Sequence, residues 1–234
     1  VVMDRVIQDL RFAVRSLTRA PGFTVVAVLT LAIGIGSNAA VFGVVKSVLM
    51  EPLPYGEPDR VVTIWSQWSG FPKTWVSRSE YRTYVTQTRS FEDLALWGEV
   101  DVTFTDPENP ERVAAVGTTE NLIEVLGVEM QAGRFFTRDE AIRTDSLPAE
   151  VIVISYEAWQ RRWNGEPGVV GTTTEMNGRM REVIGVLPEG FRLPTQFSTA
   201  EVADIYFPQY VARTAVTDYP EGGGSHGEFV VARL

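Results

Sequence analysis

Binding of a dinucleotide is the first chemistry that the residue types of this chain suggest. Gly34, Gly36 and Ala39 have the spacing G-x-G-x-x-A, which in dinucleotide-binding folds makes a tight turn against a pyrophosphate. That interpretation needs a strand before the glycines and, after them, a helix with a polar face. The residues that follow the glycines have no such face, so the motif alone is weak evidence for a nucleotide site.

The charge pattern around this motif favours a lipid-spanning helix. Between Arg19 and Lys46 there are 26 residues (46 − 19 − 1), and none of them is charged. A helix of about 26 residues reaches about 39 Å, enough to cross a hydrocarbon core of about 30 Å. We therefore predict one transmembrane helix in residues 21–50. A secretory signal peptide is the weaker alternative, because its apolar part is normally shorter.

The first twenty residues are predicted to form a cytoplasmic amphipathic helix at the membrane interface. Apolar side chains recur there at helical spacing, and Arg5, Arg11, Arg15 and Arg19 outnumber Asp4 and Asp9. By the positive-inside rule this excess of arginine places the N-terminus in the cytoplasm. Pro21 and Gly22 are expected to form the elbow between the two helices.

The two parts of the chain differ in charge. Residues 1–50 carry five basic and two acidic side chains, and the remainder carries 16 basic and 28 acidic ones, a net −12. A domain this acidic lacks the basic surface that nucleic acid requires, so no nucleic-acid partner is predicted. The chain has no cysteine, which excludes disulfides and thiolate metal sites.

Catalytic residues are few. His226 is the only histidine and follows three glycines and Ser225, so we interpret it as a solvated loop residue and not as the base of a triad. Lys46 and Lys73 are the only lysines, and neither follows glycine, which excludes a P-loop. We expect no enzyme activity, no catalytic or metal-binding residues and no cofactor. The acidic pair Asp139–Glu140 is expected at a solvated helix terminus.

Residues 51–234 are predicted to form a mixed domain of strands and helices. The predicted strands are residues 60–68, a hairpin over 100–119 with its turn at Asp106–Pro110, residues 151–155, a hairpin over 172–187 with its turn at Asn177–Gly178, residues 203–209, and residues 227–234. Three helices are predicted. The first begins at the capping box of Ser77 and Glu80, and the second ends at Gly127. The third follows the N-cap Ser155 and has Trp159 and Trp163 on one face. The segment YPEGGGSHG is expected to be a mobile loop. The last strand is expected to have an exposed edge, which suggests that the domain is incomplete.

Four aromatic residues close together leave two interpretations open. Trp65, Trp68, Phe71 and Trp75 lie within eleven residues. They are a candidate contact patch, but alternating aromatic side chains on a strand more often belong to the core.

Several separate segments of the chain resemble the permease subunits of the MacB/FtsX superfamily of ABC-type systems, and the acidobacterial duplicated orphan permeases in particular. The segment DLRFAVRSLTRAPGFT has the family's elbow, and LPYGEPDR, residues 53–60, has its exit motif. The resemblance continues through NLIEVLGVEMQAGRFFTRDE, the long segment VIVISYEAW to GFRLP, and DIYFPQ. It implies a periplasmic core domain after the first transmembrane helix.

Together these observations predict an α+β protein with three parts: an interfacial helix (1–20), a transmembrane helix (21–50) and an incomplete MacB-like periplasmic core domain (51–234). The resemblance implies a permease subunit in the bacterial inner membrane, with residues 51–234 in the periplasm. The implied partners are the lipid bilayer, a separate ABC ATPase, and further permease helices or a second permease copy. A membrane-anchored or secreted binding module is the alternative. The prolines Pro52 and Pro54 are expected to stiffen the exit from the membrane.

Overall fold

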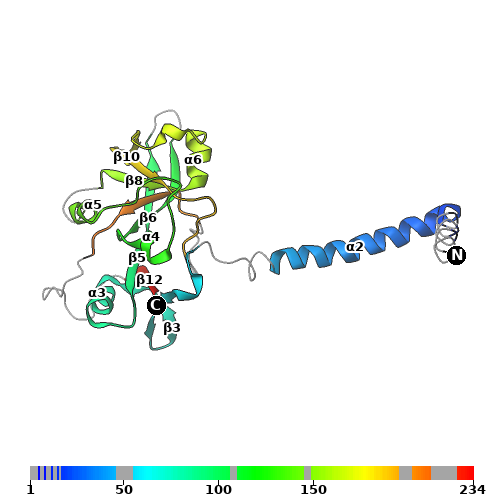
Figure 1. The fold of residues 1–234 in the computed structure, drawn as a ribbon, viewed down its shortest axis with the longest axis horizontal. Coiled ribbons are helices and arrows are strands. Elements are labelled where there is room, and N and C mark those ends of the chain that lie inside the picture. Colours follow the sequence, from blue (N-terminus) through cyan, green and yellow to red (C-terminus); the bar gives the residue numbers. More distant parts are fainter. Residues whose placement is uncertain are drawn as a thin grey trace. The chain divides into compact units, whose positions relative to one another are not determined.

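The structure is a computed structural model of the 234-residue chain, and it describes most of the residues. The described residues are 5, 8, 12, 15, 17–45, 55–105, 110–144, 149–194, 202–211 and 226–234. They divide into two compact units, Val1–Pro52 and Leu53–Leu234, which are drawn in Figure 1 and treated separately below. The exit prolines Pro52 and Pro54 lie outside the described residues.

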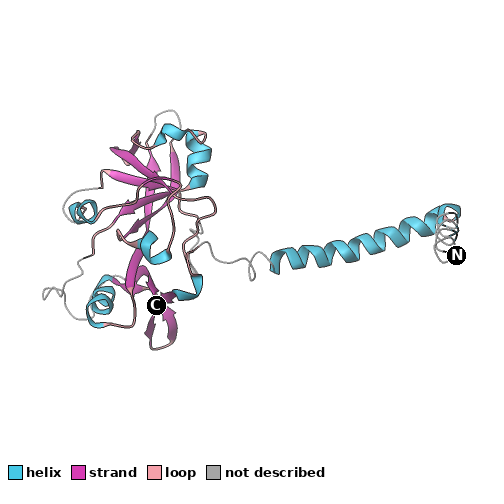
Figure 2. Cartoon of the chain, in the orientation of Figure 1, coloured by secondary structure: helices cyan, strands magenta, loops and turns pink. Residues whose placement is uncertain are grey.

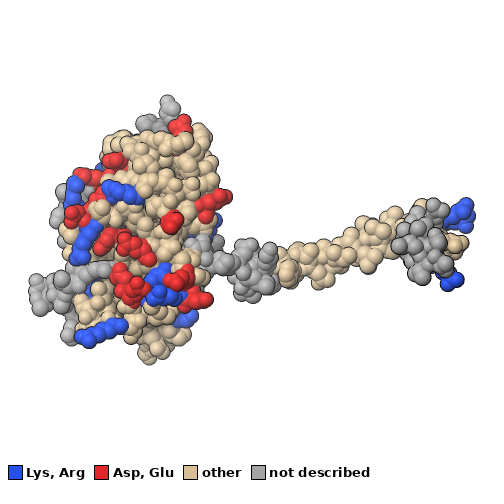
Figure 3. Space-filling model, in the orientation of Figure 1, with Lys and Arg blue, Asp and Glu red and all other residues tan. Residues whose placement is uncertain are grey.

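The first unit contains one long apolar helix, α2, from Pro21 to Val45. It is long and apolar enough to cross a membrane over Pro21–Gly43, and none of that stretch is buried against protein. Figure 3 shows no acidic or basic side chain along it. A helix that is apolar on all sides suits a lipid environment. The predicted apolar helix is confirmed.

The break between the leader and helix α2 falls at Ala20 and not at Pro21–Gly22. The described leader residues, among them Arg15 and 17–19, are helical, whereas the apolar positions on which the amphipathic pattern depends lie mostly outside the described residues. Pro21 occupies the first turn of α2, where its missing N–H removes no hydrogen bond. The Thr24 hydroxyl donates to the carbonyl oxygens of Leu17 (2.8 Å) and Ala20 (3.0 Å) and so bridges the break.

The second unit is built on a mixed sheet of ten strands. Its strands are β1 (Val61–Ile64), β4 (Val76–Ser77), β5 (Asp93–Phe104), β6 (Glu111–Thr118), β7 (Ala132–Gly133), β8 (Val151–Ile154), β9 (Thr173–Met176), β10 (Arg179–Val186), β11 (Ile205–Pro208) and β12 (His226–Arg233). The order is β1-β12-β5-β6-β11-β8-β10-β7, with β4 beside β12 and β9 beside β10 and β5. The pairs β11–β6 and β10–β8 are parallel, and the other pairs are antiparallel.

Short helices and a separate hairpin complete the domain. The helices are α3 (Arg78–Gln87), α4 (Leu122–Leu126), α5 (Arg138–Arg143) and α6 (Tyr156–Trp163), with 3-10 turns η2 (Pro58–Arg60) and η3 (Pro167–Val169). Strands β2 (Ser66–Trp68) and β3 (Phe71–Thr74) pair only with each other. Figure 2 shows the helices around a central body of strands. The α+β class is therefore confirmed.

Strand β5 shows why one apolar run supports two cores. Successive side chains of a strand point to opposite faces of the sheet. Ala95 and Trp97 accordingly enter a first core with Phe229 and helix α4, while Leu94 and Leu96 enter another core with helix α3. Further along, Phe104 belongs to a third core that Trp159 and Trp163 of helix α6 cover. Because both faces are covered, the sequence of β5 is continuously apolar over residues 94–97.

The predicted caps and the Asn177–Gly178 turn are confirmed, whereas most of the turn predicted at Asp106–Pro110 lies outside the described residues. Ser77 and Glu80 form the capping box of α3, and the Ser155 hydroxyl accepts a bond from the Ala158 amide (3.0 Å) at the start of α6. Asn177 and Gly178 both have positive φ, 49° and 70°, as their hairpin between β9 and β10 requires. Helix α4 ends at Gly127, and β5 pairs with β6 as a hairpin.

Three predictions about the strands were wrong. The predicted strand 60–68 breaks at Trp65, so β1 stays in the large sheet and β2 leaves it. The last strand, β12, has no exposed edge, because it lies between β1 and β5. His226 is not a loop residue either, since it opens β12 and pairs with Ser77 of β4. The preceding residues, 212–225, lie outside the described part of the chain.

Two glycines with nearly equal φ provide a test of close packing between β7 and β10. Gly133 (φ 69°) and Gly190 (φ 74°) share the left-handed conformation, but a Cβ on Gly133 would lie 2.2 Å from the Ile184 carbonyl oxygen, whereas one on Gly190 meets nothing within 4 Å. Gly190→Ala is expected to cost about 1 kcal/mol, from backbone strain alone. Gly133→Ala is expected to cost about 3 kcal/mol or more, because backbone must move as well. Urea unfolding of the full chain in lipid nanodiscs measures both, and equal losses would contradict the steric explanation.

Candidate functional site

The start of the folded domain is held by several hydrogen bonds, and we call this region the entry site: Tyr55, Gly56, Glu57, Glu157, Arg192 and Arg233. Tyr55 is only 7% exposed, and its hydroxyl donates to the Arg192 carbonyl oxygen at 2.6 Å. Burial raises the pKa of Tyr55, so the hydroxyl stays neutral and remains a donor. The first described residue of the domain is thus fixed to a segment more than 130 residues later in the sequence.

Arg192 extends this contact to helix α6. Its guanidinium Nη1 lies 2.8 Å from Glu157 Oε1, and Glu157 is in the first turn of α6. Glu157 Oε2 is buried and has no hydrogen-bond partner in the structure. Nearby, burial and then the charge of Glu157 raise the pKa of the fully buried Tyr206. The polar groups of this cluster hold the chain in place, and none of them is set up as a nucleophile beside a base.

Gly56 lies against the end of helix α4. Its amide donates to the carbonyl oxygens of Leu126 (3.0 Å) and Gly127 (3.1 Å), and a Cβ on Gly56 would be only 2.7 Å from the Gly127 oxygen. Gly127 itself has φ 64°, which ends the helix. Only glycine allows this close approach of the two backbones.

Arg233 connects the entry to the last strand. Its side chain is 10% exposed, its Nε donates to the Val125 carbonyl oxygen at 2.9 Å, and its Nη2 donates to the Gly56 carbonyl oxygen at 2.9 Å. Glu57 Oε2 lies 3.4 Å from Nη1. One guanidinium therefore bonds the entry segment, helix α4 and strand β12 to one another.

Strand pairing also brings the start of the domain and strand β12 together. Val61 of β1 faces Arg233 of β12 in the antiparallel register, and the Leu234 amide donates to the Arg60 carbonyl oxygen at 2.8 Å. The Arg60 guanidinium in turn donates to the Leu234 carbonyl oxygen and, at 3.0 Å, to Glu92. The entry segment and β12 therefore cannot move apart without breaking several hydrogen bonds.

The structure gives His226 a partner that the sequence did not indicate. Its Nε2 lies 3.3 Å from Glu80 Oε2, and its ring meets Trp68 edge-on with centroids 4.5 Å apart. The hydroxyls of Ser66 and Ser77 donate to Glu80, at 2.8 Å and 2.9 Å, and not to the imidazole. This arrangement orients the histidine without activating a serine.

The four aromatic residues do not share one environment. Trp65 packs on the first core and meets Phe229 edge-on at 6.2 Å. Trp68, Phe71 and Trp75 are 45%, 63% and 44% exposed. The core interpretation is therefore wrong for three of the four.

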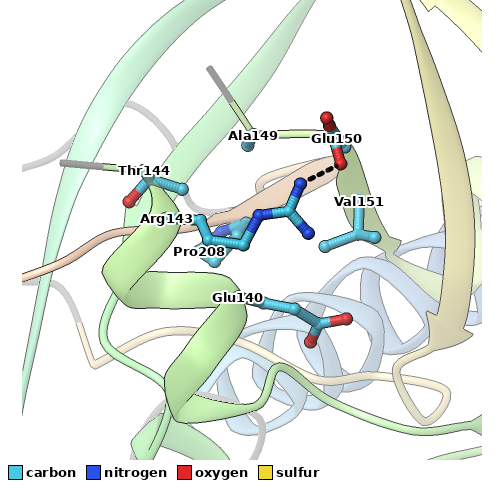
Figure 4. A pocket seen from close by; sticks show the side chains of 7 residues that line it. All are labelled: Glu140, Arg143, Thr144, Ala149, Glu150, Val151 and Pro208. Carbon is cyan, nitrogen blue, oxygen red and sulfur yellow. Dashed lines mark hydrogen bonds and ion pairs between the residues drawn. The ribbon is translucent and has the colours of Figure 1, made fainter. Parts of the chain in front are cut away.

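A shallow depression beside helix α5 brings no new chemistry. Its lining consists of Glu140, Arg143, Thr144, Ala149, Glu150, Val151 and Pro208 (Figure 4). The Arg143 and Glu150 side chains pair with each other at 2.7 Å. Glu140 caps α5 in a capping box with Thr137, so the acidic pair Asp139–Glu140 stands at a helix terminus as predicted. The expected solvation is confirmed for Asp139 but is wrong for Glu140, whose side chain is 18% exposed and pairs with Arg134 at 2.7 Å. Within the described residues, no group of three or more metal-ligating side chains occurs.

Glu140 gives this helix a pH dependence. The hydrogen bond from Arg134, followed by those from Thr137, lowers the pKa of Glu140 from 4.5 to about 2. A lowered pKa in the folded state stabilises the fold above the ordinary pKa, and this contribution is lost as the pH falls from about 4.5 towards 2. In Glu140→Gln we expect the urea midpoint to change less over this interval than in the parent chain, whereas the exposed control Glu189→Gln should follow the parent. Identical pH profiles of Glu140→Gln and the parent would contradict this assignment.

Comparison with known proteins gives the fold a family. The sequence matches the family model of the MacB-like periplasmic core domain over residues 24–234. No curated protein sequence matches the chain.

Solved structures agree with this match at the level of the fold. The periplasmic region of MacB from Actinobacillus actinomycetemcomitans is 15% identical, with a TM-score of 0.53 over 80% of this chain and 79% of that one. A domain from Porphyromonas gingivalis that is assigned to a permease protein is 18% identical, with a TM-score of 0.52 over 77% of each chain. These two likenesses show a shared fold. Since the family model spans most of the sequence, the chain belongs to the family of MacB-like periplasmic core domains.

Proposed function

We propose that this chain is a membrane-spanning permease subunit of an ABC-type system, for transport or for transmission of force across the membrane. The observation that carries the proposal is the family match, which runs from residue 24 and so includes most of helix α2 as well as the domain. Helix α2 supports it independently, because its length and composition suit a lipid bilayer. The end-to-end sequence resemblance further favours the acidobacterial duplicated orphan type.

The entry site supports a mechanical role for the domain. A displacement that arrives through residues 46–54 would act on Tyr55 and Gly56 first. From there, the bonds to Arg192 and Glu157 lead to helix α6, and the bonds of Arg233 lead to helix α4 and strand β12. A chain of hydrogen-bonded contacts between packed elements is a route by which such a shift would reach these elements.

A separate ATPase is the proposed energy source. The chain has no Gly-Lys pair for a P-loop, so we assign it neither nucleotide binding nor catalysis. The basic leader and the acidic domain support a cytoplasmic N-terminus, a periplasmic domain and a place in the bacterial inner membrane. Further permease helices or a second copy would complete the membrane part, because one helix cannot enclose a path.

The test is reconstitution of the full chain in lipid vesicles with and without a co-expressed ATPase from the same genome. We expect the chain alone to bind no ATP, and the pair to purify together and to hydrolyse it. ATP binding by the purified chain, or failure of every co-encoded ATPase to associate with it, would overturn the proposal.

The entry site has its own variant in this assay. Tyr55→Phe removes one buried hydrogen bond, which corresponds to about a fivefold shift in a two-state coupling equilibrium. We expect ATP hydrolysis by the complex to respond by about that factor, and the control Tyr84→Phe, on helix α3, to leave it unchanged. Equal behaviour of the two variants would remove the entry site from the mechanism without touching the permease assignment.

A further inference from the structure

A small hairpin carries a large share of the exposed apolar surface of the domain. We call residues 66–75, which comprise β2, its turn, β3 and Trp75, the aromatic hairpin. Of eight large hydrophobic side chains that are exposed in the described part of residues 55–234, three belong to it: Trp68, Phe71 and Trp75. Exposed aromatic side chains that lie close together in the sequence of a domain surrounded by water indicate a contact surface.

The aromatic hairpin is held firmly at its base. Ser66 and Thr74 face each other across the two strands, and both are buried. The Ser66 hydroxyl donates to Glu80 of helix α3, and the Trp68 ring rests on His226 of strand β12. The exposed aromatic side chains are therefore presented by an ordered element that is anchored to the domain on two sides.

The charge of the aromatic hairpin differs from that of the rest of the domain. Between Val61 and Ser77 the only charged residue is Lys73, whereas residues 51–234 together carry a net −12. In Figure 3 the acidic side chains lie mainly over the middle of the domain, and the lower tip, where Figure 1 labels β3, is largely uncharged. This tip combines tryptophan and phenylalanine with one lysine and no carboxylate.

These residue types suit the interface of a lipid bilayer. Tryptophan concentrates at the level of the lipid headgroups, where its ring is buried and its N–H stays hydrated. Lysine beside it is attracted to anionic headgroups. A bilayer is also available to this chain through helix α2, and the nine residues 46–54 that precede Tyr55 reach roughly 30 Å when extended.

We propose that the aromatic hairpin inserts Trp68, Phe71 and Trp75 into the headgroup region of a bilayer that contains anionic lipid. Such a contact gives the domain a second attachment to the membrane, in addition to helix α2. Its contribution is expected to increase with the anionic lipid content, because Lys73 is the one charged residue of the aromatic hairpin and carries a positive charge.

Site-directed spin labelling tests this proposal directly, because the chain has no cysteine of its own. Phe71→Cys and the control Met180→Cys replace side chains of similar exposure, 63% and 58%, on different strands. The full chain carrying either label is placed in phosphatidylcholine vesicles with and without phosphatidylglycerol. Collision rates with oxygen, which enters lipid, and with a nickel chelate, which stays in water, then report the surroundings of each label.

We expect the oxygen-to-nickel ratio at position 71 to exceed the ratio at position 180 several-fold, and to rise further with phosphatidylglycerol. Lys73→Gln should remove that further rise and leave the ratio in phosphatidylcholine unchanged. Equal ratios at the two positions would mean that the hairpin is in water and would overturn the proposal. Protection of position 71 from both reagents would overturn it as well, because the hairpin would then be covered by protein, such as a second copy of the chain.

Discussion

Replacement of Trp97 by alanine is expected to lower the free energy of unfolding by about 4 kcal/mol, because it removes the largest fully buried side chain of the domain. The Trp97 ring stacks on Phe229 with centroids 4.1 Å apart and planes 9° from parallel. This pair joins the facing positions of β5 and β12, since Trp97 and Phe229 are partners in the register. The cavity would therefore open in the centre of the first core.

The measurement is hydrogen exchange of the β5 and β12 amides in the full chain in nanodiscs, which reports the opening free energy of these strands. Met180→Ala is the control, because this large apolar side chain of β10 is 58% exposed and lies outside the aromatic hairpin, and it should change that free energy by less than about 0.5 kcal/mol. Trp97→Phe should cost less than about 1.5 kcal/mol, since it keeps a ring on Phe229 and removes the indole N–H, which is buried without a partner. If Trp97→Ala and Met180→Ala had equal effects, Trp97 would not be the centre of this core.

Replacement of Arg233 by methionine is expected to cost about 3 kcal/mol, because it leaves the buried carbonyl oxygens of Val125 and Gly56 without their charged donor. The loss should appear at the entry site first, as faster exchange of the Gly56 amide and of the β1 amides. Arg233→Lys should recover part of the loss, since a single ammonium cannot donate to both oxygens with the geometry of a guanidinium.

Arg112 is the control for this second prediction. It pairs with Asp101 at 2.6 Å, a shorter distance than any contact of Arg233 quoted above, but both side chains are largely exposed, 73% and 85%. Arg112→Met should therefore have no measurable effect on stability, because water screens the exposed pair. A comparable loss in both arginine variants would show that ion-pair distance, and not burial, governs the effect.

The entry site follows from tertiary structure and not from any motif. Its residues come from positions 55–57, 157, 192 and 233, and the hydrogen bond from Tyr55 to Arg192 joins residues 137 apart in sequence. The signal available in the sequence was the exit motif LPYGEPDR, which the resemblance covered without assigning its tyrosine a contact. Hydrogen bonds over such distances depend on how the sheet is ordered, which a local pattern does not contain.

The sequence by itself determined the features that depend on neighbouring residues. The uncharged run before Lys46 predicts helix α2, because a helix without a polar face needs apolar surroundings on all sides. The capping box of Ser77 and Glu80, the N-cap Ser155 and the Asn177–Gly178 turn were also predictable, since each satisfies backbone groups within a few residues of itself.

Tertiary structure alone decided the features that depend on distant partners. Strand β12 is internal because β1 pairs with its second edge, and His226 is ordered because Glu80 and Trp68 pack against it. The alternation of apolar side chains continues in the sequence beyond Ile64, but the chain leaves the large sheet there. Trp68 is therefore exposed, although the alternation alone favours a core position for it. Periodicity records which side chains share a face of a strand, whereas the packing of the whole domain decides whether that face is covered.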